Sequence, residues 1–124
     1  MPCILMVAEK PALADTISGI LSKKSCKSSQ SGATAVFEWT GPFQGQPGYT
    51  FRMTSVKGHV LSTDFPARFQ SWDKTDPRDL FDAPVERKEC SGGMCRHLQT
   101  VAKGCDQLVL WLDCDREGEN ICFE

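Results

Sequence analysis

The sequence has no run of apolar residues long enough to cross a lipid bilayer. Its longest apolar stretches, CILMVA and LVLWL, fall far short of the roughly 20 residues that a membrane-spanning helix needs. The amino-terminal end also lacks the basic flank and the small-residue cleavage site of a secretory signal. These features exclude a membrane class and predict a protein of the cytosol or the nucleus.

An excess of basic charge is also missing, since 14 Lys and Arg residues stand against 16 Asp and Glu residues, for a net charge of -2. A domain that binds nucleic acid by itself usually carries a basic surplus. Any contact with DNA or RNA must therefore be local, or must be completed by another part of a longer protein.

The cysteine pattern fits neither a disulfide framework nor a zinc site. Seven cysteines, an odd number, are scattered along the chain, and this predicts free thiols. The stretch CSGGMCRH, which contains Cys90, Cys95 and His97, has no C-x-x-C pair and offers no clear fourth ligand.

What the sequence does contain is enough apolar residues, 40% of 124, to build one globular domain. The stretch ILMVAE is typical of a strand buried on both faces, and KPALADTISGILSKK after it predicts a helix that begins at Pro11. The apolar face of this helix is predicted to consist of Leu13, Ile17, Ile20 and Leu21.

The middle of the chain alternates polar loops with β-rich runs. We expect SKKSCKSSQSGATA to be an exposed loop, and AVFEWTGPF and YTFRMTSV to be neighbouring strands separated by the turn QGQPG. Residues 58–90 are predicted to form an irregular excursion with one short helical turn near Pro77 to Leu80.

A second strand and helix unit lies at the carboxyl end. We expect a helix over MCRHLQTVAK that stops at Gly104, a second strand buried on both faces in QLVLWLD, and the start of a helix in EGENICFE. An apolar strand is followed by a helix near each end of the chain. This order predicts an α/β fold, with a mainly parallel sheet flanked by helices. Because the last helix has only begun, we expect residues 1–124 to be one domain, truncated near its carboxyl end, of a longer protein.

Carboxylates cluster where the two apolar strands end. Glu9 ends the first strand, and Asp113, Asp115 and Glu117 follow the second. In a parallel sheet these ends meet at one edge, where ligands bind. Alternation along an extended chain puts Asp113 and Asp115 on one side, and such hard oxygen donors suit Mg²⁺. The alternative is that the acids only cap the helix that follows.

Three segments in order, EKP at 9–11, GHV at 58–60 and DCDREGE at 113–119, resemble the Toprim domain of type IA DNA topoisomerases. The similarity extends over essentially the whole chain and is closest to the beta type of eukaryotic topoisomerase III. It implies a Rossmann-like Toprim fold. It also implies an ATP-independent isomerase that breaks one DNA strand through a covalent 5′-phosphotyrosine, passes another strand and rejoins the first.

The resemblance implies a role for each site residue. Glu9 matches the acid that handles the proton of the leaving 3′-oxygen, and Lys10 matches the neighbouring residue that contacts the scissile phosphate. Asp113, Asp115 and Glu117 match the triad that holds Mg²⁺, for which Mn²⁺ can substitute. These roles are physically reasonable, because neighbouring carboxylates favour a protonated acid and a lysine can neutralise charge on a phosphate.

Other implications of the resemblance concern partners and residues outside this group. The implied partners are single-stranded DNA, with RNA as a second candidate, the remaining domains of the full-length enzyme, and a Tudor-domain protein, in the nucleus and also the cytoplasm. Arg116 contacts phosphate or forms a salt bridge within the acid cluster, and His59 contacts nucleic acid or is an ordinary turn histidine. The nucleophilic tyrosine of the family lies in another domain, so Tyr49 is not expected to replace it and the chain alone should be inactive.

Two other functions stay open on the sequence. A stand-alone Toprim nuclease or primase-like protein would keep the fold and use metal-activated water. In a non-catalytic binding domain the clustered carboxylates would only cap a helix. Such a domain would show no specific binding of Mg²⁺.

Overall fold

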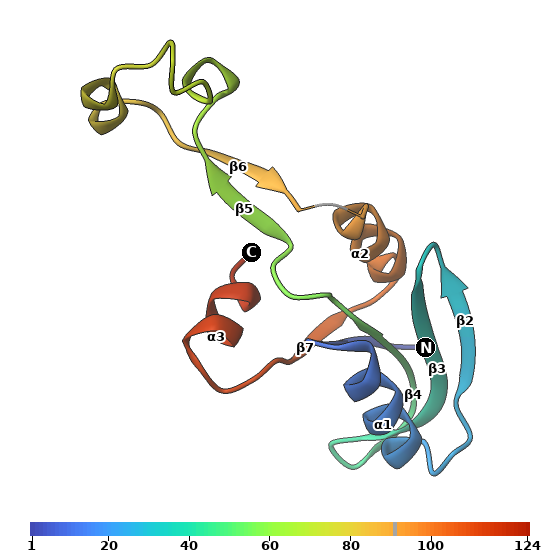
Figure 1. The fold of residues 1–124 in the computed structure, drawn as a ribbon. Helices are drawn as coiled ribbons and strands as arrows, with labels where there is room; N and C mark the ends of the chain where they lie inside the picture. Colours follow the sequence, from blue (N-terminus) through green and yellow to red (C-terminus); the bar gives the residue numbers. More distant parts are fainter. Residues whose placement is uncertain (91) are drawn as a thin grey trace.

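The structure, a computed structural model, describes residues 1–90 and 92–124. Within these residues no helix is long and apolar enough to cross a membrane. Strands and helices alternate along the chain (Figure 1), in the order β1 (Cys3–Ala8), α1 (Pro11–Leu21), β2 (Lys27–Ser31), β3 (Thr34–Phe43), β4 (Gln46–Ser55), β5 (Leu61–Asp64), two short 3-10 helices (Ala67–Phe69 and Pro77–Phe81), β6 (Glu86–Glu89), α2 (Met94–Ala102), β7 (Gln107–Trp111) and α3 (Arg116–Cys122).

The main sheet has five strands in the order β2-β3-β4-β1-β7. β1 runs parallel to both of its neighbours, β4 and β7, whereas β2, β3 and β4 form an antiparallel meander. The predicted α/β class, with a sheet flanked by helices, is confirmed. The parallel half of the sheet contains the two strand ends at which the carboxylates were predicted to gather.

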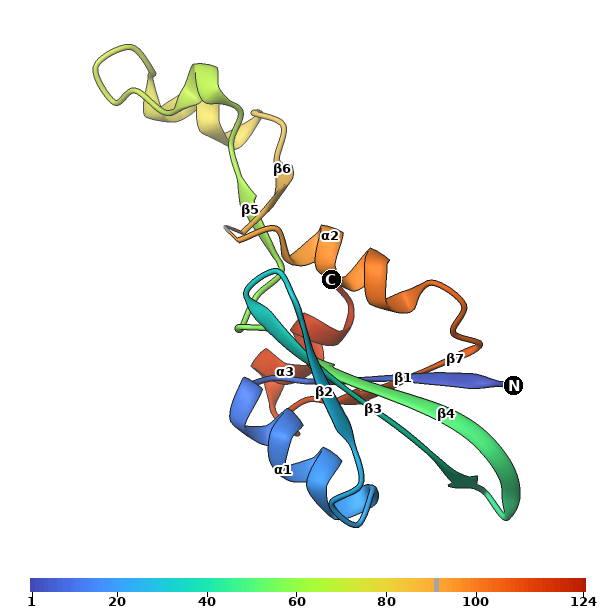
Figure 2. The ribbon, with the colours of Figure 1, turned by 90° about the vertical axis from the view of Figure 1, so that its right-hand side faces the viewer.

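Both faces of the sheet are covered, and β1 is buried along its whole length. On one face, α1 packs with Ala14 near Ile4, Met6 and Met53. On the other face, α2 and α3 contribute Val101 and Ile121 to a second cluster. Figure 2 shows α1 and α2 on opposite sides of the sheet. A strand buried on both faces explains why β1 is a continuous apolar run.

The prediction of a second fully buried strand was wrong for β7, although the strand itself and its parallel direction were right. β7 lies at the edge of the sheet, and Leu108 and Leu110 are 58% and 43% exposed. An apolar run indicates that a strand can be buried, but it does not state how many neighbours the strand has. Among the described residues, nothing pairs with the outer edge of β7.

Three other expectations need correction. The polar segment after α1 is not a loop throughout, because Lys27–Ser31 forms β2, an exposed strand held by pairing with β3. Residues 61–90 contain the predicted helical turn at Pro77–Phe81, but they also form the β5–β6 hairpin, which projects from the main sheet (Figure 1). The predicted apolar face of α1 was right only for Ile17, which packs against the core together with the buried Ala14. Leu13, Ile20 and Leu21 are exposed.

Candidate functional site

The carboxyl ends of β1 and β7 place two acids side by side. Ala8 is paired with Trp111 across the two parallel strands, so Glu9 and Asp113 leave the sheet at the same edge. Glu9 is buried, and it lines the same hollow as Asp113. The predicted meeting of Glu9 with the acids of the last strand is therefore present in the structure.

The electrostatics of this pair favour a proton on Glu9. Hydrogen bonding to Asp113, burial and the negative charge of Asp113 raise the pKa of Glu9, and Lys10 opposes the shift. The Asp115 charge adds to the rise. A raised pKa suits a carboxyl group to proton transfer.

The acids line an open hollow of about 520 Å³ at the edge of the sheet. Two lysines share it, and its lining consists of Glu9, Lys10, Pro11, Lys57, Gly58, Asp113, Asp115 and Glu117. The five residues that were predicted to be catalytic or metal-binding thus lie around one space. Lys57 was not singled out from the sequence, because a lysine before a turn is ordinarily a solvated surface residue.

The first turn of α3 is fixed by Asp115 and Gly118. The Asp115 side chain is the N-cap, since its Oδ1 accepts a hydrogen bond of 2.7 Å from the backbone N–H of Gly118. Gly118 packs so closely against the backbone of Asp113 that an added Cβ would overlap the Asp113 carbonyl oxygen. The helix-capping explanation therefore holds for Asp115, but no capping hydrogen bond engages the side chains of Asp113 or Glu117 among the described residues.

The residues fit a divalent cation by their chemistry more than by their present arrangement. Asp113, Asp115 and Glu117 supply the hard carboxylate oxygens that Mg²⁺ prefers. In residues 1–90 and 92–124, however, no three His, Cys, Asp or Glu side chains converge closely enough to enclose a metal ion. The acids share a hollow, and all three are exposed at its surface.

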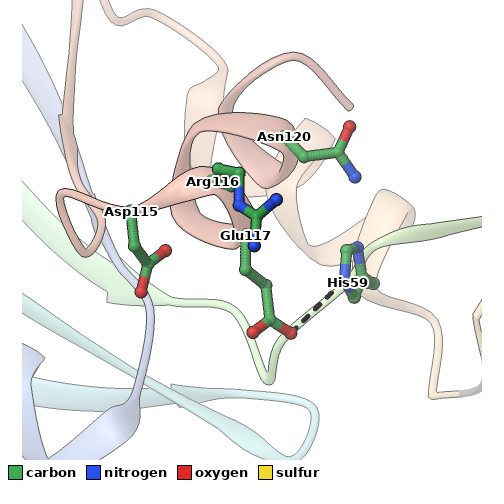
Figure 3. A pocket seen from close by; sticks show the side chains of 5 residues that line it. All are labelled: His59, Asp115, Arg116, Glu117 and Asn120. Atoms are coloured by element: carbon green, nitrogen blue, oxygen red, sulfur yellow. Dashed lines mark ion pairs between the residues drawn. The ribbon is translucent and has the colours of Figure 1, made fainter.

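A second hollow of about 610 Å³ adjoins the first, because Asp115 and Glu117 line both. Its other lining residues are His59, Arg116 and Asn120 (Figure 3). His59 Nε2 lies 3.5 Å from Glu117 Oε1, so the turn histidine does face the acid cluster. Arg116 forms no ion pair with a described residue. The salt-bridge interpretation of Arg116 is thus not supported by the described contacts.

Glu124, which the sequence analysis did not single out, contacts the second hollow through His59. Its side chain is only 6% exposed, and Oε1 accepts a hydrogen bond of 2.7 Å from Nδ1 of His59. Burial disfavours the ionised form, but hydrogen bonds from His59 and from the Leu61 and Val60 N–H groups outweigh it and lower the pKa of Glu124. The same contact raises the pKa of His59. No signal in the sequence relates a glutamate after α3 to a turn 65 residues earlier.

Two other candidates lie away from this edge. His97 is buried and its Nε2 bonds Thr54 Oγ1 at 2.6 Å, so it is a core residue. Tyr49 packs against Phe43 and directly precedes Thr50, the residue of β4 that pairs with Cys3 at the start of β1. The site lies beyond the other end of the paired strands, roughly 20 Å away at about 3.3 Å per residue.

Comparison with known proteins gives a family match over residues 4–124, to the Toprim domain. The chain is 54% identical to DNA topoisomerase 3-beta-1 of Homo sapiens over 100% of its length, and 53% identical to DNA topoisomerase 3-beta of Arabidopsis thaliana over 98%. DNA topoisomerase 3-alpha of Arabidopsis thaliana is 42% identical over 98% of the chain. The chain spans 13–15% of the length of these relatives.

Proposed function

Because the chain belongs to the Toprim domain family, we propose that residues 1–124 supply the metal and acid half of the active site of a type IA DNA topoisomerase III, of the beta type. The domain would be the amino-terminal part of a longer enzyme, consistent with the 13–15% of the relatives' length that it spans. The greater identity to the 3-beta than to the 3-alpha relatives supports the beta type.

One observation carries the proposal, the meeting of Glu9 and Asp113 at the ends of two parallel strands. An isolated helix cap would need neither a buried Glu9 nor a lysine pair beside the acids. A phosphodiester that is broken and rejoined needs a proton donor, a positive charge near the phosphate and a metal ligand set. Residues of all three kinds line the same hollow.

Each residue has a distinct part in this proposal. Glu9 donates a proton to the 3′-oxygen as it leaves and takes it back when the strand is rejoined. Lys10 contacts the scissile phosphate, and Lys57 adds a second positive charge in the same hollow. Arg116 and His59 contact the neighbouring phosphate from the adjoining hollow.

Toprim domains bind divalent metal ions, and Asp113, Asp115 and Glu117 would hold the metal here. We propose Mg²⁺ as the natural ion, with Mn²⁺ as a substitute, because both prefer carboxylate oxygens. When bound, the ion would offset the negative charge of the acids and of a substrate phosphate.

The partners and location follow from the same proposal. Single-stranded DNA is the proposed substrate and RNA the second candidate, and the domains that complete the enzyme supply the tyrosine. A Tudor-domain protein as partner, and a location in the nucleus and also the cytoplasm, rest on the family resemblance alone. The net charge of -2 supports the view that other domains supply most of the basic surface for nucleic acid.

Metal titration tests the proposal directly. Calorimetry of the chain with Mg²⁺ should show weak, saturable binding, because without a phosphate the ion lacks part of its ligand set. A variant carrying Asp113→Asn, Asp115→Asn and Glu117→Gln should show no saturable heat. Glu119→Gln, an exposed acid of the same helix, is the matched control and should bind as the parent does.

Equal heats from the parent and the triple variant would contradict the proposal. They would favour a binding domain in which the acids only cap the helix. The stand-alone nuclease is the other outcome, and it would be shown by Mg²⁺-dependent nicking of single-stranded DNA by the 124-residue chain itself.

A further inference from the structure

Glu124 combines burial with a complete set of hydrogen-bond donors. Its Oε2 accepts from the backbone N–H groups of Val60 and Leu61, at 2.8 and 3.1 Å. Its Oε1 accepts from His59 Nδ1 at 2.7 Å, and Asn120 Nδ2 lies 3.5 Å from the same atom. A buried carboxylate is tolerated only with such partners. The end of α3 is thereby tied to the turn between β4 and β5.

The contact with Glu124 determines how the His59 ring is presented. An imidazole that donates Nδ1–H to a carboxylate has its other nitrogen, Nε2, on the far side of the ring. In the structure Nε2 faces Glu117 Oε1, 3.5 Å away, in the hollow beside the acid cluster. Figure 3 shows His59 and Glu117 directed toward each other across this space.

We propose that Glu124 is a positioning residue, which holds His59 with Nδ1–H on its own carboxylate and Nε2 toward the metal and phosphate site. A phosphate oxygen accepts from Nε2 only when Nε2 also carries a proton. This use of Nε2 rests on the proposed function, whereas the geometry of the pair does not. Carboxylates that orient a histidine in this way fix its tautomer and ring direction, as they do in metal and nucleophile sites.

The tautomer of His59 gives a test that a merely structural Glu124 would not affect. In Glu124→Gln, the two backbone N–H groups still require the side-chain oxygen. The NH₂ group of the new side-chain amide then faces His59 Nδ1, and an NH₂ group can only donate a hydrogen bond. Nδ1 must become an acceptor, and the proton moves to Nε2. In Glu124→Ala the ring should show a mixture of both tautomers.

The measurement is the pair of ¹⁵N imidazole shifts of the 124-residue chain, recorded at a pH above the pKa of His59. The chain has two histidines, and His97 serves as the internal reference. Its Nε2 lies 2.6 Å from Thr54 Oγ1, in the core and away from the substituted residues. The expected result is Nδ1–H for His59 in the parent chain and in the control Glu119→Gln, and Nε2–H in Glu124→Gln, with His97 unchanged throughout.

A tautomer of His59 that is the same in Glu124→Gln as in Glu119→Gln would overturn the proposal. An even mixture of tautomers in the parent chain would do so as well. If Glu124→Ala does not fold, the two glutamine variants still decide the question. Failure of the metal titration would remove the proposed function but leave this result intact, so the two failures are distinguishable.

Discussion

Gly118 determines how closely α3 can approach the end of β7. An added Cβ would overlap the Asp113 carbonyl oxygen, and backbone atoms cannot move aside as a flexible side chain can. We expect Gly118→Ala to lower the free energy of unfolding by about 1–3 kcal/mol, as overpacking usually does. It should also weaken Mg²⁺ binding, because Asp113 is displaced. Urea unfolding and calorimetry measure the two effects.

Gly19 is the matched control for this substitution, since it is a helical glycine with no atom within 4 Å of an added Cβ. Gly19→Ala should raise the free energy of unfolding by about 0.5–1 kcal/mol, because alanine loses less backbone entropy in a helix. Destabilisation by both changes to the same extent would show that the close approach to Asp113 is not the cause.

His97 makes the stability of the chain depend on pH. Burial lowers the pKa of His97, and a backbone contact with Ser31 opposes this only in part. The unfolded chain therefore takes up a proton near pH 6.5, whereas the folded chain takes it up only at a lower pH. The free energy of unfolding should fall as the pH is lowered from about 7 to 5, by at most about 1.4 kcal/mol per pH unit for one proton.

The variant His97→Gln can still donate to Thr54 but cannot titrate, so its unfolding free energy should be less sensitive to pH over this range. Urea unfolding at a series of pH values provides the comparison. An unchanged slope in the variant would mean that other groups cause the acid sensitivity.

At the scale of elements, the contrast between β1 and β7 gives a paired test. Leu5 and Leu108 are register partners in adjacent parallel strands, but Leu5 is 4% exposed and Leu108 is 58% exposed. Leu5→Ala should lower the free energy of unfolding by about 2–5 kcal/mol, or leave the chain unfolded. Leu108→Ala should cost less than about 1 kcal/mol. Chemical denaturation of both variants checks this, and equal losses would mean that β7 is covered in solution.

The same contrast shows how far the elements could be predicted. Local signals were sufficient for β1, for the start of α1 at Pro11 and for the β3–β4 hairpin, because apolar continuity, proline and turn residues act within a few residues. They could not locate β2, whose polar sequence becomes a strand only by pairing with β3. They also could not show that β7 is an edge strand, since that depends on which strands lie beside it.

The candidate site was predictable where its residues follow strand ends. Glu9 and Asp113 are separated by most of the chain, but the parallel pairing of their strands brings them together as predicted. Lys57 and Glu124 were missed because their positions depend on how the turn after β4 meets the end of α3. The roles of all these residues in chemistry stay predictions until they are tested by substitution.

For the molecule as a whole, the position of Tyr49 predicts what the chain cannot do. It lies at the opposite end of the β1–β4 register from the acids. The 124-residue chain should therefore neither relax supercoiled plasmid nor form a covalent adduct with DNA in the presence of Mg²⁺. Gel assays of relaxation and of protein-linked DNA measure this. An adduct that disappears in Tyr49→Phe would show that Tyr49 can act as a nucleophile after all.

The central place of β1 also affects the order in which the molecule can form. Met6 pairs with Met53 on one side and with Val109 on the other, so β1 has both of its edges paired only after β7, roughly 100 residues later in the chain, has been synthesised. At about 5–20 residues per second, roughly 100 residues take on the order of 5–20 s to synthesise. During this interval one edge of a wholly apolar strand is unpaired, which makes the nascent chain a natural client for chaperones. Glu9 and Asp113 can meet only after β7 has paired with β1, so this part of the site is assembled only once the sheet is complete.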